Sequence, residues 1–373
     1  IQGISEVKSY NLIGKQTKRL NAANEACVRA NVKMELAYVP YHFLQSVVTK
    51  LTGAAIIGLS AYFYINGSMS VLYAVGMSIA AFMLYGGLET MGTFSSLIHV
   101  VSVCVDKANV VLGLDTMDID GKELNPENHD IEVKNIEFSY DKRKIIDGIS
   151  LTIPEKTTTA IVGPSGGGKT TLCNLIARFW DVDSGEITLS GTNVKDYSMN
   201  SLMNNFSFVF QNVYLFADTI ENNIKFGRPE ATHEEVVEAA KKACCHDFIS
   251  KLPDGYNTVI GEGGATLSGG EKQRISIARA IMKDSPIIIL DEATANVDPE
   301  NEKELTLAVD ALTKEKTIIM IAHRLKTVRH ADQIVVVDQG RIAQKGTHEE
   351  LMKQDGIYRR FVDSRELAVS WKI

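Results

Sequence analysis

The residues best suited to chemistry occupy positions 163–171, which follow a short apolar run and precede a helical pattern. Gly163, Gly168, Lys169 and Thr170 match G-x-x-x-x-G-K-[ST], in which glycines let backbone N–H groups converge on a phosphate without Cβ clashes. The lysine can reach the β- and γ-phosphates of a nucleotide, and the threonine hydroxyl can bind Mg²⁺. The stretch is therefore predicted to bind a nucleotide through Gly163, Pro164, Ser165, Gly166, Gly167, Gly168, Lys169, Thr170 and Thr171.

A pair of carboxylates follows a second apolar run, residues 287–290. Such runs are typical of strands buried on both faces of a parallel sheet, and ligands gather at the carboxyl ends of these strands. Beside a phosphate loop, Asp291 is expected to hold Mg²⁺ through its water shell. Glu292 is expected to orient or deprotonate a water at the γ-phosphate. His323 follows another buried-strand run, residues 317–322, although a lone histidine is usually structural.

A second glycine-rich helix start precedes the helical pattern of residues 272–281. Helix N-termini of this kind bind anions, so this is a second possible phosphate site. One nucleotide does not need two such sites from one chain, and a head-to-tail pair of chains would use both. The residues of this second site are Leu267, Ser268, Gly269, Gly270 and Glu271.

Strands must position these residues. Residues 131–139 alternate apolar and polar side chains, as a half-buried strand does, and residues 149–153 and 159–162 are predicted to be further strands. Tyr140 ends the first of these strands, where an aromatic ring could stack on a nucleotide base. The alternative interpretation of Tyr140 is an ordinary tyrosine at a strand end.

The first third of the chain is apolar enough to meet a membrane. Residues 39–65 and 69–88 are mostly apolar, a tight turn at 66–68 separates them, and the second run continues as a helix towards residue 105. A span needs about 20 apolar residues, so two transmembrane helices are predicted within 39–105. The alternative is a pair of buried core helices. Lys50 either snorkels to the interface or faces a polar cavity.

Charge orients this hairpin. The turn has no Lys or Arg, whereas residues 1–38 carry six and Lys107 follows the second run. The positive-inside rule then places both ends in the cytoplasm, with residues 1–38 as a cytoplasmic helical extension. Residues 106–128 shift to Asp, Asn, Gly and Pro and are assigned to a linker. The net charge of −7 over 373 residues does not favour nucleic-acid binding.

Together these features resemble an ABC transporter of the exporter-type fold, with fused membrane and ATP-binding domains. The resemblance covers essentially the whole chain and is most specific over residues 129–366, before a tail at 367–373. It implies a membrane α-helical hairpin followed by an α/β P-loop NTPase domain with a helical subdomain. Such half-transporters carry six membrane helices, so the chain is expected to be the C-terminal portion of one.

The resemblance also implies residue roles. Tyr140 is similar to the A-loop tyrosine that stacks on adenine, and residues 163–171 to the Walker A loop. Gln211 matches the Q-loop glutamine, which touches Mg²⁺ and the attacking water and links the site to the membrane domain. Asp291 and Glu292 match the Walker B aspartate and the catalytic glutamate, and His323 matches the switch histidine.

Residues 267–271 resemble the signature loop, which binds the ATP of a partner chain, and Asp298 lies in a D-loop. Residues 261–264 stand where exporters carry a loop facing the partner's membrane domain. Three positions depart from the family pattern: Gly167 replaces the commoner serine, Glu271 the commoner glutamine and Val297 the usual leucine. None removes a catalytic group, so this half is expected to hydrolyse ATP.

The function implied by the resemblance is ATP hydrolysis, with Mg²⁺, coupled to export of a substrate. The expected setting is a multi-pass protein of the cell membrane, in contact with lipid, with its ATP-binding domain in the cytoplasm. The expected partner is a second half-transporter, in a homodimer or heterodimer, and no nucleic acid is expected. Two alternatives remain at this point: an importer of a metal chelate or siderophore, and a soluble ABC ATPase of repair or translation. The sequence leaves the transported substrate undefined.

Overall fold

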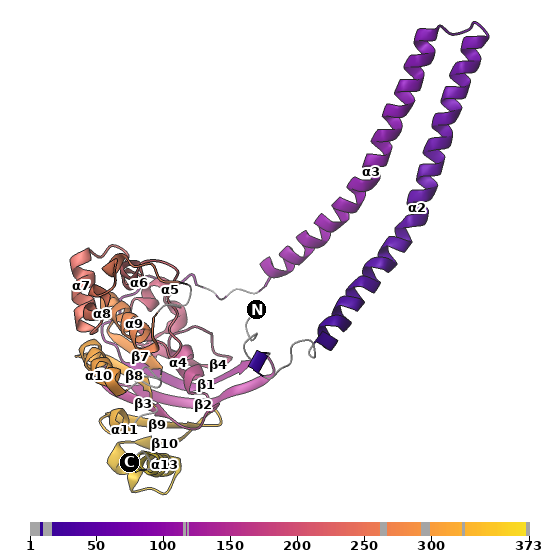
Figure 1. Cartoon of the computed structure of the whole chain (residues 1–373). Coiled ribbons are helices and arrows are strands. Elements are labelled where there is room, and N and C mark those ends of the chain that lie inside the picture. The colour runs from indigo at the N-terminus through magenta and orange to yellow at the C-terminus, as the bar shows by residue number, and fades with distance from the viewer. Residues whose placement is uncertain are drawn as a thin grey trace. The chain divides into compact units, whose positions relative to one another are not determined.

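A computed structural model describes residues 8–9, 17–114, 117, 119–261, 267–291, 299–322 and 325–370. The chain divides into two compact units, Ile1–Asp115 and Thr116–Ile373 (Figure 1).

The first unit is a hairpin of two long helices, α2 (Thr17–Ile65) and α3 (Val71–Leu112), which pack against each other (Figure 1). The chain reverses between them because Gly67 takes a left-handed φ of 70°, which costs glycine little. The Ser68 amide donates to the Phe63 carbonyl, and the Ser70 side chain caps the start of α3. The reversal therefore lies at the predicted turn, while α3 begins two residues later than expected.

Helix boundaries in this unit differ from the predicted ones. α2 is continuous through Pro40, so the predicted cytoplasmic extension and the first predicted span belong to one helix. α3 continues to Leu112, seven residues into the predicted linker. Residues 106–112 contain no glycine or proline, and the first breaker is Gly113, so the helix has no local reason to end earlier.

One helical segment among the described residues, Asn21–Ile65, is long and apolar enough to cross a membrane by length and composition. Val71–Met83 is a shorter apolar helical segment. Large apolar side chains along both helices are exposed, Leu51, Phe82 and Leu112 among them. Exposed apolar surface on this scale marks an interaction with lipid or protein. The second predicted span stays a prediction.

The second unit is built on a six-stranded sheet in the order β10-β9-β3-β8-β7-β6. All neighbours are parallel except β10, which pairs antiparallel to β9. Its inner strands are almost wholly apolar and buried, as expected when helices cover both faces. The strands are β3 (Thr158–Val162), β6 (Phe206–Val209), β7 (Ile287–Asp291), β8 (Thr317–Ile321), β9 (Gln333–Asp338) and β10 (Arg341–Gly346).

A four-stranded antiparallel sheet has the order β2-β1-β4-β5. One face of it shares a core with the parallel sheet and with helix α4 (Lys169–Ile176), because buried Ile136, Leu189 and Leu172 belong to one apolar cluster. The half-buried alternation predicted for residues 131–139 is confirmed by the burial of β1. The strands are β1 (Ile131–Tyr140), β2 (Arg143–Ile153), β4 (Ser184–Leu189) and β5 (Thr192–Asn193).

A second apolar cluster joins helices α6 to α10 and includes Ile224, Val236 and Ile275. This is the helical subdomain that the resemblance implied. The helices of the unit are η1 (Val194–Asp196), α5 (Met199–Met203), α6 (Ile220–Lys225), α7 (His233–Lys242), α8 (His246–Ser250), η2 (Gly255–Asn257), α9 (Gly269–Lys283), α10 (Pro299–Thr313), α11 (Leu325–Val328), α12 (His348–Met352) and α13 (Ile357–Ser370).

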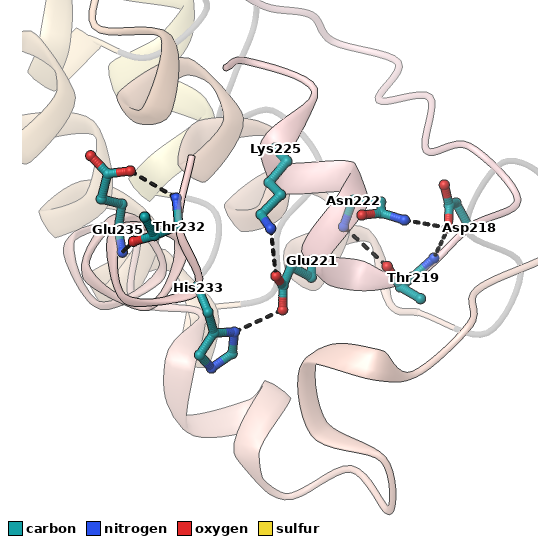
Figure 2. A network of polar contacts seen from close by, with 8 residues as sticks. All are labelled: Asp218, Thr219, Glu221, Asn222, Lys225, Thr232, His233 and Glu235. Carbon is teal, nitrogen blue, oxygen red and sulfur yellow. Dashed lines mark hydrogen bonds and ion pairs between the residues drawn. The ribbon is translucent and has the colours of Figure 1, made fainter. Parts of the chain in front are cut away.

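Polar contacts fasten α6 to α7 within this subdomain (Figure 2). The Glu221 carboxylate lies between Lys225 Nζ at 2.8 Å and His233 Nδ1 at 2.7 Å. Thr219 and Thr232 cap the two helices, and Thr232 forms a capping box with Glu235. Burial raises the pKa of the Glu221 carboxyl, but the hydrogen bonds from Lys225 and His233 outweigh it and hold the pKa below its ordinary value.

This lowered pKa makes the Glu221 contribution to stability depend on pH. As pH falls, the unfolded state takes up a proton on Glu221 before the folded state does. The contribution of Glu221 to stability is therefore complete above the pKa of the unfolded state and is lost as pH falls through the pKa of the folded state. At neutral pH, Glu221→Gln is expected to lower the thermal unfolding midpoint by about 2–4 °C. The gap to wild type should close as pH falls below 4. A gap that does not change with pH would contradict this, and exposed Glu230→Gln serves as the control.

The core shared by the two sheets yields a second stability prediction. Leu189 is fully buried, so Leu189→Ala removes apolar contacts and leaves a cavity. We expect a loss of about 2–5 kcal/mol in the free energy of unfolding, measured by denaturant titration in detergent. Leu307 is 52% exposed on α10, and Leu307→Ala should change the free energy by less than about 0.5 kcal/mol. Equal losses in the two variants would refute this assignment of the core.

Candidate nucleotide-binding site

The phosphate loop connects the end of β3 to the start of α4. Gly163, Gly166 and Gly168 have φ angles of 143°, 77° and 104°, a region that residues other than glycine rarely adopt. A Cβ at Gly163 would lie only 2.0 Å from the Val337 carbonyl oxygen of β9. The loop is thus packed backbone against backbone, which explains why glycine is needed where the sequence places it.

Lys169, the first residue of α4, points back across this loop. Lys169 is only 8% exposed, and its Nζ donates to the carbonyls of Gly163 at 3.0 Å and Pro164 at 2.9 Å. These two bonds hold the ammonium group against the backbone of the loop. This is the position from which a lysine acts on the β- and γ-phosphates of a nucleotide.

The structure brings Thr170 and Asp291 together across 121 residues of chain. The Thr170 hydroxyl donates to Asp291 Oδ2 at 3.3 Å. Asp291 ends β7, which is separated from β3 by β8, so the carboxyl ends of these parallel strands create the contact. Nearby Cys173 is buried, and burial together with the Asp291 charge raises the pKa of its thiol far above the usual range.

Tyr140 lies at the end of β1 with its residue 37% exposed. Its ring meets Phe138 edge-on at a centroid distance of 4.8 Å and Trp180 edge-on at 5.6 Å. The sequence interpretation missed Trp180, which follows the phosphate-loop helix by four residues. These two contacts restrict the Tyr140 ring while leaving part of it accessible, as a base-stacking residue requires.

The signature-like loop starts helix α9. Ser268 is its N-cap, and it forms a capping box in which the Glu271 amide donates to Ser268 Oγ at 3.3 Å and the Ser268 amide to Glu271 Oε2 at 2.8 Å. Glutamate and glutamine both complete such a box, so the Glu271 departure is compatible with this helix start. Gly270 is buried and Gly269 is exposed at the first turn.

Gln211 follows β6 by two residues and is exposed. The preceding carbonyl, that of Phe210, accepts a hydrogen bond from Gln273 Nε2 of α9 at 3.4 Å. The Phe210 ring stacks on Phe208 at 5.4 Å with an interplanar angle of 6°. The Gln211 segment is therefore tied to the signature helix, a contact that the motifs did not indicate.

Glu292, Asp298 and His323 lie outside the described residues, as do residues 262–264 and 371–373. Their neighbours are described, however. Asp291 and Ile321 are register partners in β7 and β8, so the strands that lead into Glu292 and His323 end side by side. The catalytic assignments of these residues remain predictions.

Comparison with known proteins places this site in a family. Residues 146–295, from β2 through the phosphate loop and β7, match the model of the ABC transporter domain. This part of the chain is an ABC transporter domain. The domain binds ATP, which accounts for the phosphate loop, and the exporter-type resemblance inferred from the motifs is confirmed.

Similarity to relatives extends over the apolar hairpin. The chain is 42% identical over 325 residues to an ATP-dependent lipid A-core flippase of Desulfotalea psychrophila, covering 85% of the chain and 57% of that protein. It is 39% identical over 385 residues to a Staphylococcus aureus protein named for multidrug export as an ATP-binding/permease protein, covering 98% and 64%. The chain thus spans about 60% of the length of these relatives.

A solved structure supports the same architecture. The structure of a bacterial Atm1-family ABC exporter with ATP bound matches with a TM-score of 0.85 at 33% identity. The match covers 97% of this chain and 64% of the exporter chain. An apolar N-terminal helix followed by an α/β ABC domain is therefore an exporter architecture.

The close packing of the phosphate loop predicts that Gly163→Ala impairs ATP binding. The added methyl must displace the Val337 carbonyl or distort the loop, at a cost of about 1–3 kcal/mol. We expect ATP affinity, measured by titration calorimetry, to fall about 10-fold. Gly76→Ala is the matched control, because a Cβ at Gly76 meets nothing within 4 Å. Unchanged affinity in Gly163→Ala would contradict the loop geometry.

Proposed function

We propose that this chain is the motor and adjoining membrane hairpin of an exporter-type ABC half-transporter, which couples ATP hydrolysis to movement of a substrate across the cell membrane. The observation that carries the proposal is the Thr170–Asp291 contact, since it joins the phosphate loop to the acidic end of β7. Phosphoryl transfer to water requires this juxtaposition of phosphate-binding and acidic groups. The exporter relatives support the coupling to transport.

The residues at this juncture fit Mg²⁺. A hydroxyl oxygen and a carboxylate oxygen 3.3 Å apart are hard ligands of the type that this cation prefers. Thr170 would bind the ion directly, Asp291 through water, and Gln211 would approach it from the end of β6. When bound, Mg²⁺ neutralises charge on the β- and γ-phosphates.

Each remaining residue has a role toward ATP and the attacking water. Lys169 binds the β- and γ-phosphates, and Tyr140 stacks on the adenine. Glu292 takes a proton from the attacking water or orients it, and His323 senses the γ-phosphate from the neighbouring strand end. Gln211 reports the state of the site to the membrane segment.

The signature loop, residues 267–271, serves the ATP of a second half-transporter. The phosphate loop lies between β3 and α4, whereas the signature loop lies on the helical subdomain, at the start of α9. A head-to-tail dimer uses both, and the Asp298 segment faces the partner in it. The closed dimer has a higher affinity for ATP than the open dimer, so binding of two ATP molecules favours closure. Hydrolysis removes the ATP, and the dimer then opens.

The apolar hairpin α2–α3 is the transmembrane part, a multi-pass segment with both ends and the ATP-binding domain in the cytoplasm. The apolar segment Asn21–Ile65 and the exposed apolar surface of both helices support contact with lipid. The relatives' names concern a lipid A-core and multidrug export, which supports an amphipathic cargo moved outward. Candidate cargoes are distinguished by their stimulation of ATP hydrolysis in proteoliposomes.

Glu292→Gln is expected to separate binding from turnover. The amide cannot accept the water's proton, so steady-state hydrolysis should fall about 100-fold or more while ATP affinity is kept. Phosphate release and nucleotide affinity are measured on the same proteoliposome sample.

Lys169→Ala is the matched variant, because it removes the phosphate-binding charge and should abolish ATP binding. Near-normal hydrolysis in Glu292→Gln would exclude its role as the base. Retained ATP affinity in Lys169→Ala would refute the site itself.

A further inference from the structure

The segment that joins the helical hairpin to the ATP-binding unit is fastened to that unit. We call residues 119–124 the strap; it begins seven residues after the end of α3. The strap lies on one short stretch, residues 194–198, which we call the η1 turn. The Lys122 amide donates to the Asp196 carbonyl at 2.8 Å, and the Ser198 amide donates to the Lys122 carbonyl at 2.8 Å. This is one rung of parallel β-pairing, Lys122 with Tyr197.

Side chains extend the attachment. Ser198 Oγ donates to Glu123 Oε1 at 2.7 Å, and the Ser201 hydroxyl donates to the Lys122 carbonyl at 3.3 Å. The strap backbone is so close that a Cβ at Gly121 would lie 2.3 Å from the Tyr197 carbonyl carbon and oxygen. Gly121 is thus required by contact with the turn, because any side chain there would push the strap away.

The same turn is held from the inside by Arg178. This residue is 2% exposed, and its Nη1 donates to three carbonyls of the turn, those of Val194 and Lys195 at 3.3 Å and Tyr197 at 3.4 Å. Its Nε donates to Asp181 at 3.0 Å. A planar guanidinium suits such an arrangement because its donors are fixed relative to one another.

Arg178 also ends the phosphate-binding helix. It has a left-handed φ of 55°, its amide donates to the Leu175 carbonyl, and the Phe179 amide donates to the Asn174 carbonyl. These two bonds form a Schellman cap of α4, in which glycine is the usual residue. This backbone conformation costs arginine about 1 kcal/mol, and the side-chain hydrogen bonds of Arg178 can offset that cost. Helix α4 has eight residues, about 12 Å, and begins at Lys169.

We infer that Arg178 is a positioning residue that couples the strap to the phosphate loop. A displacement of the strap moves the η1 turn, the turn moves the guanidinium, and Arg178 moves the end of the short helix that carries Lys169. The chain leaving α3 thereby reaches the ATP site of its own chain. This inference rests on the proposed function, because it assumes that residues 163–171 bind ATP.

Linkage supplies the test, since a strap that affects nucleotide binding must itself respond to nucleotide. Hydrogen–deuterium exchange is measured on the full chain in lipid nanodiscs, with and without the non-hydrolysable analogue AMP-PNP and Mg²⁺. We expect the analogue to slow exchange of residues 163–172 and, by about 5-fold, that of the amides of Lys122 and Ser198. In Arg178→Gly, which keeps the left-handed cap, protection of residues 163–172 should persist and the strap response should disappear.

A strap response that survives in Arg178→Gly, or that is absent from wild type while residues 163–172 are protected, overturns the inference. If residues 163–172 are not protected either, the proposed function fails instead. Arg341→Ala is the control for loss of an arginine, because Arg341 pairs with Asp147 at an exposed site and does not touch the turn.

Gly121→Ala tests the coupling from the other end and leaves α4 intact, so it decides the question if Arg178→Gly does not fold. Exchange at Lys122 and Ser198 should rise, and AMP-PNP affinity should fall by about 5-fold, the same factor as the strap response. Faster strap exchange with unchanged AMP-PNP affinity would mean that the strap is only a tether.

Discussion

The fold depends on one close approach, that of the phosphate-loop backbone to the strands around it. The Gly163 Cα faces the Val337 carbonyl of β9, and the Gly340 amide donates to the Gly167 carbonyl at 3.0 Å. On the other side, a Cβ at Gly168 would lie 2.9 Å from the Ile146 side chain of β2. The loop is thus held between the two sheets, and these contacts restrict the orientation of its backbone groups.

The parallel sheet explains why the loop and the acidic end of β7 lie together. Because β3, β8 and β7 run parallel and in register, their carboxyl ends share one edge of the sheet. The loop leaves from β3, Asp291 ends β7, and His323 follows β8 by two residues. Thr170 and Asp291, which are more than a hundred positions apart, meet at that edge.

Helix α9 has a second part in this arrangement. Gln273 holds the Phe210 carbonyl beside Gln211. Lys283 Nζ donates to the Met203 carbonyl at the end of α5 and to the Phe206 carbonyl at the start of β6. Burial lowers the pKa of the Lys283 ammonium, consistent with its use as an internal tie. The helix that begins with the signature loop is therefore joined to both ends of the strand that leads to Gln211. Together with Arg178 and the strap, these ties give the ATP site several connections to the rest of its own chain.

The sequence by itself determined the phosphate loop, the buried strands, the acidic strand end and the apolar hairpin. Each of these follows from local residue types. Glycines occur where φ must be positive, uninterrupted apolar runs where both faces of a strand are covered, and longer apolar stretches where a helix can span a bilayer. The chemistry of a helix start also indicated a second phosphate site at residues 267–271. Family resemblance then added a role for Gln211, which local chemistry does not reveal.

Only the tertiary structure decided which distant groups meet. Three such contacts depend on where backbone segments cross. They are the ring contact of Trp180 with Tyr140, the hydrogen bond from Gln273 to the Phe210 carbonyl, and the hydrogen bonds from Arg178 to three carbonyls. Nothing in the spacing of these residues encodes a crossing, because a single arginine or glutamine has the same local propensities wherever it points. The structure also decided where the helices end. Helices α2 and α3 continue past the positions where the composition changes, until a turn or a glycine ends them.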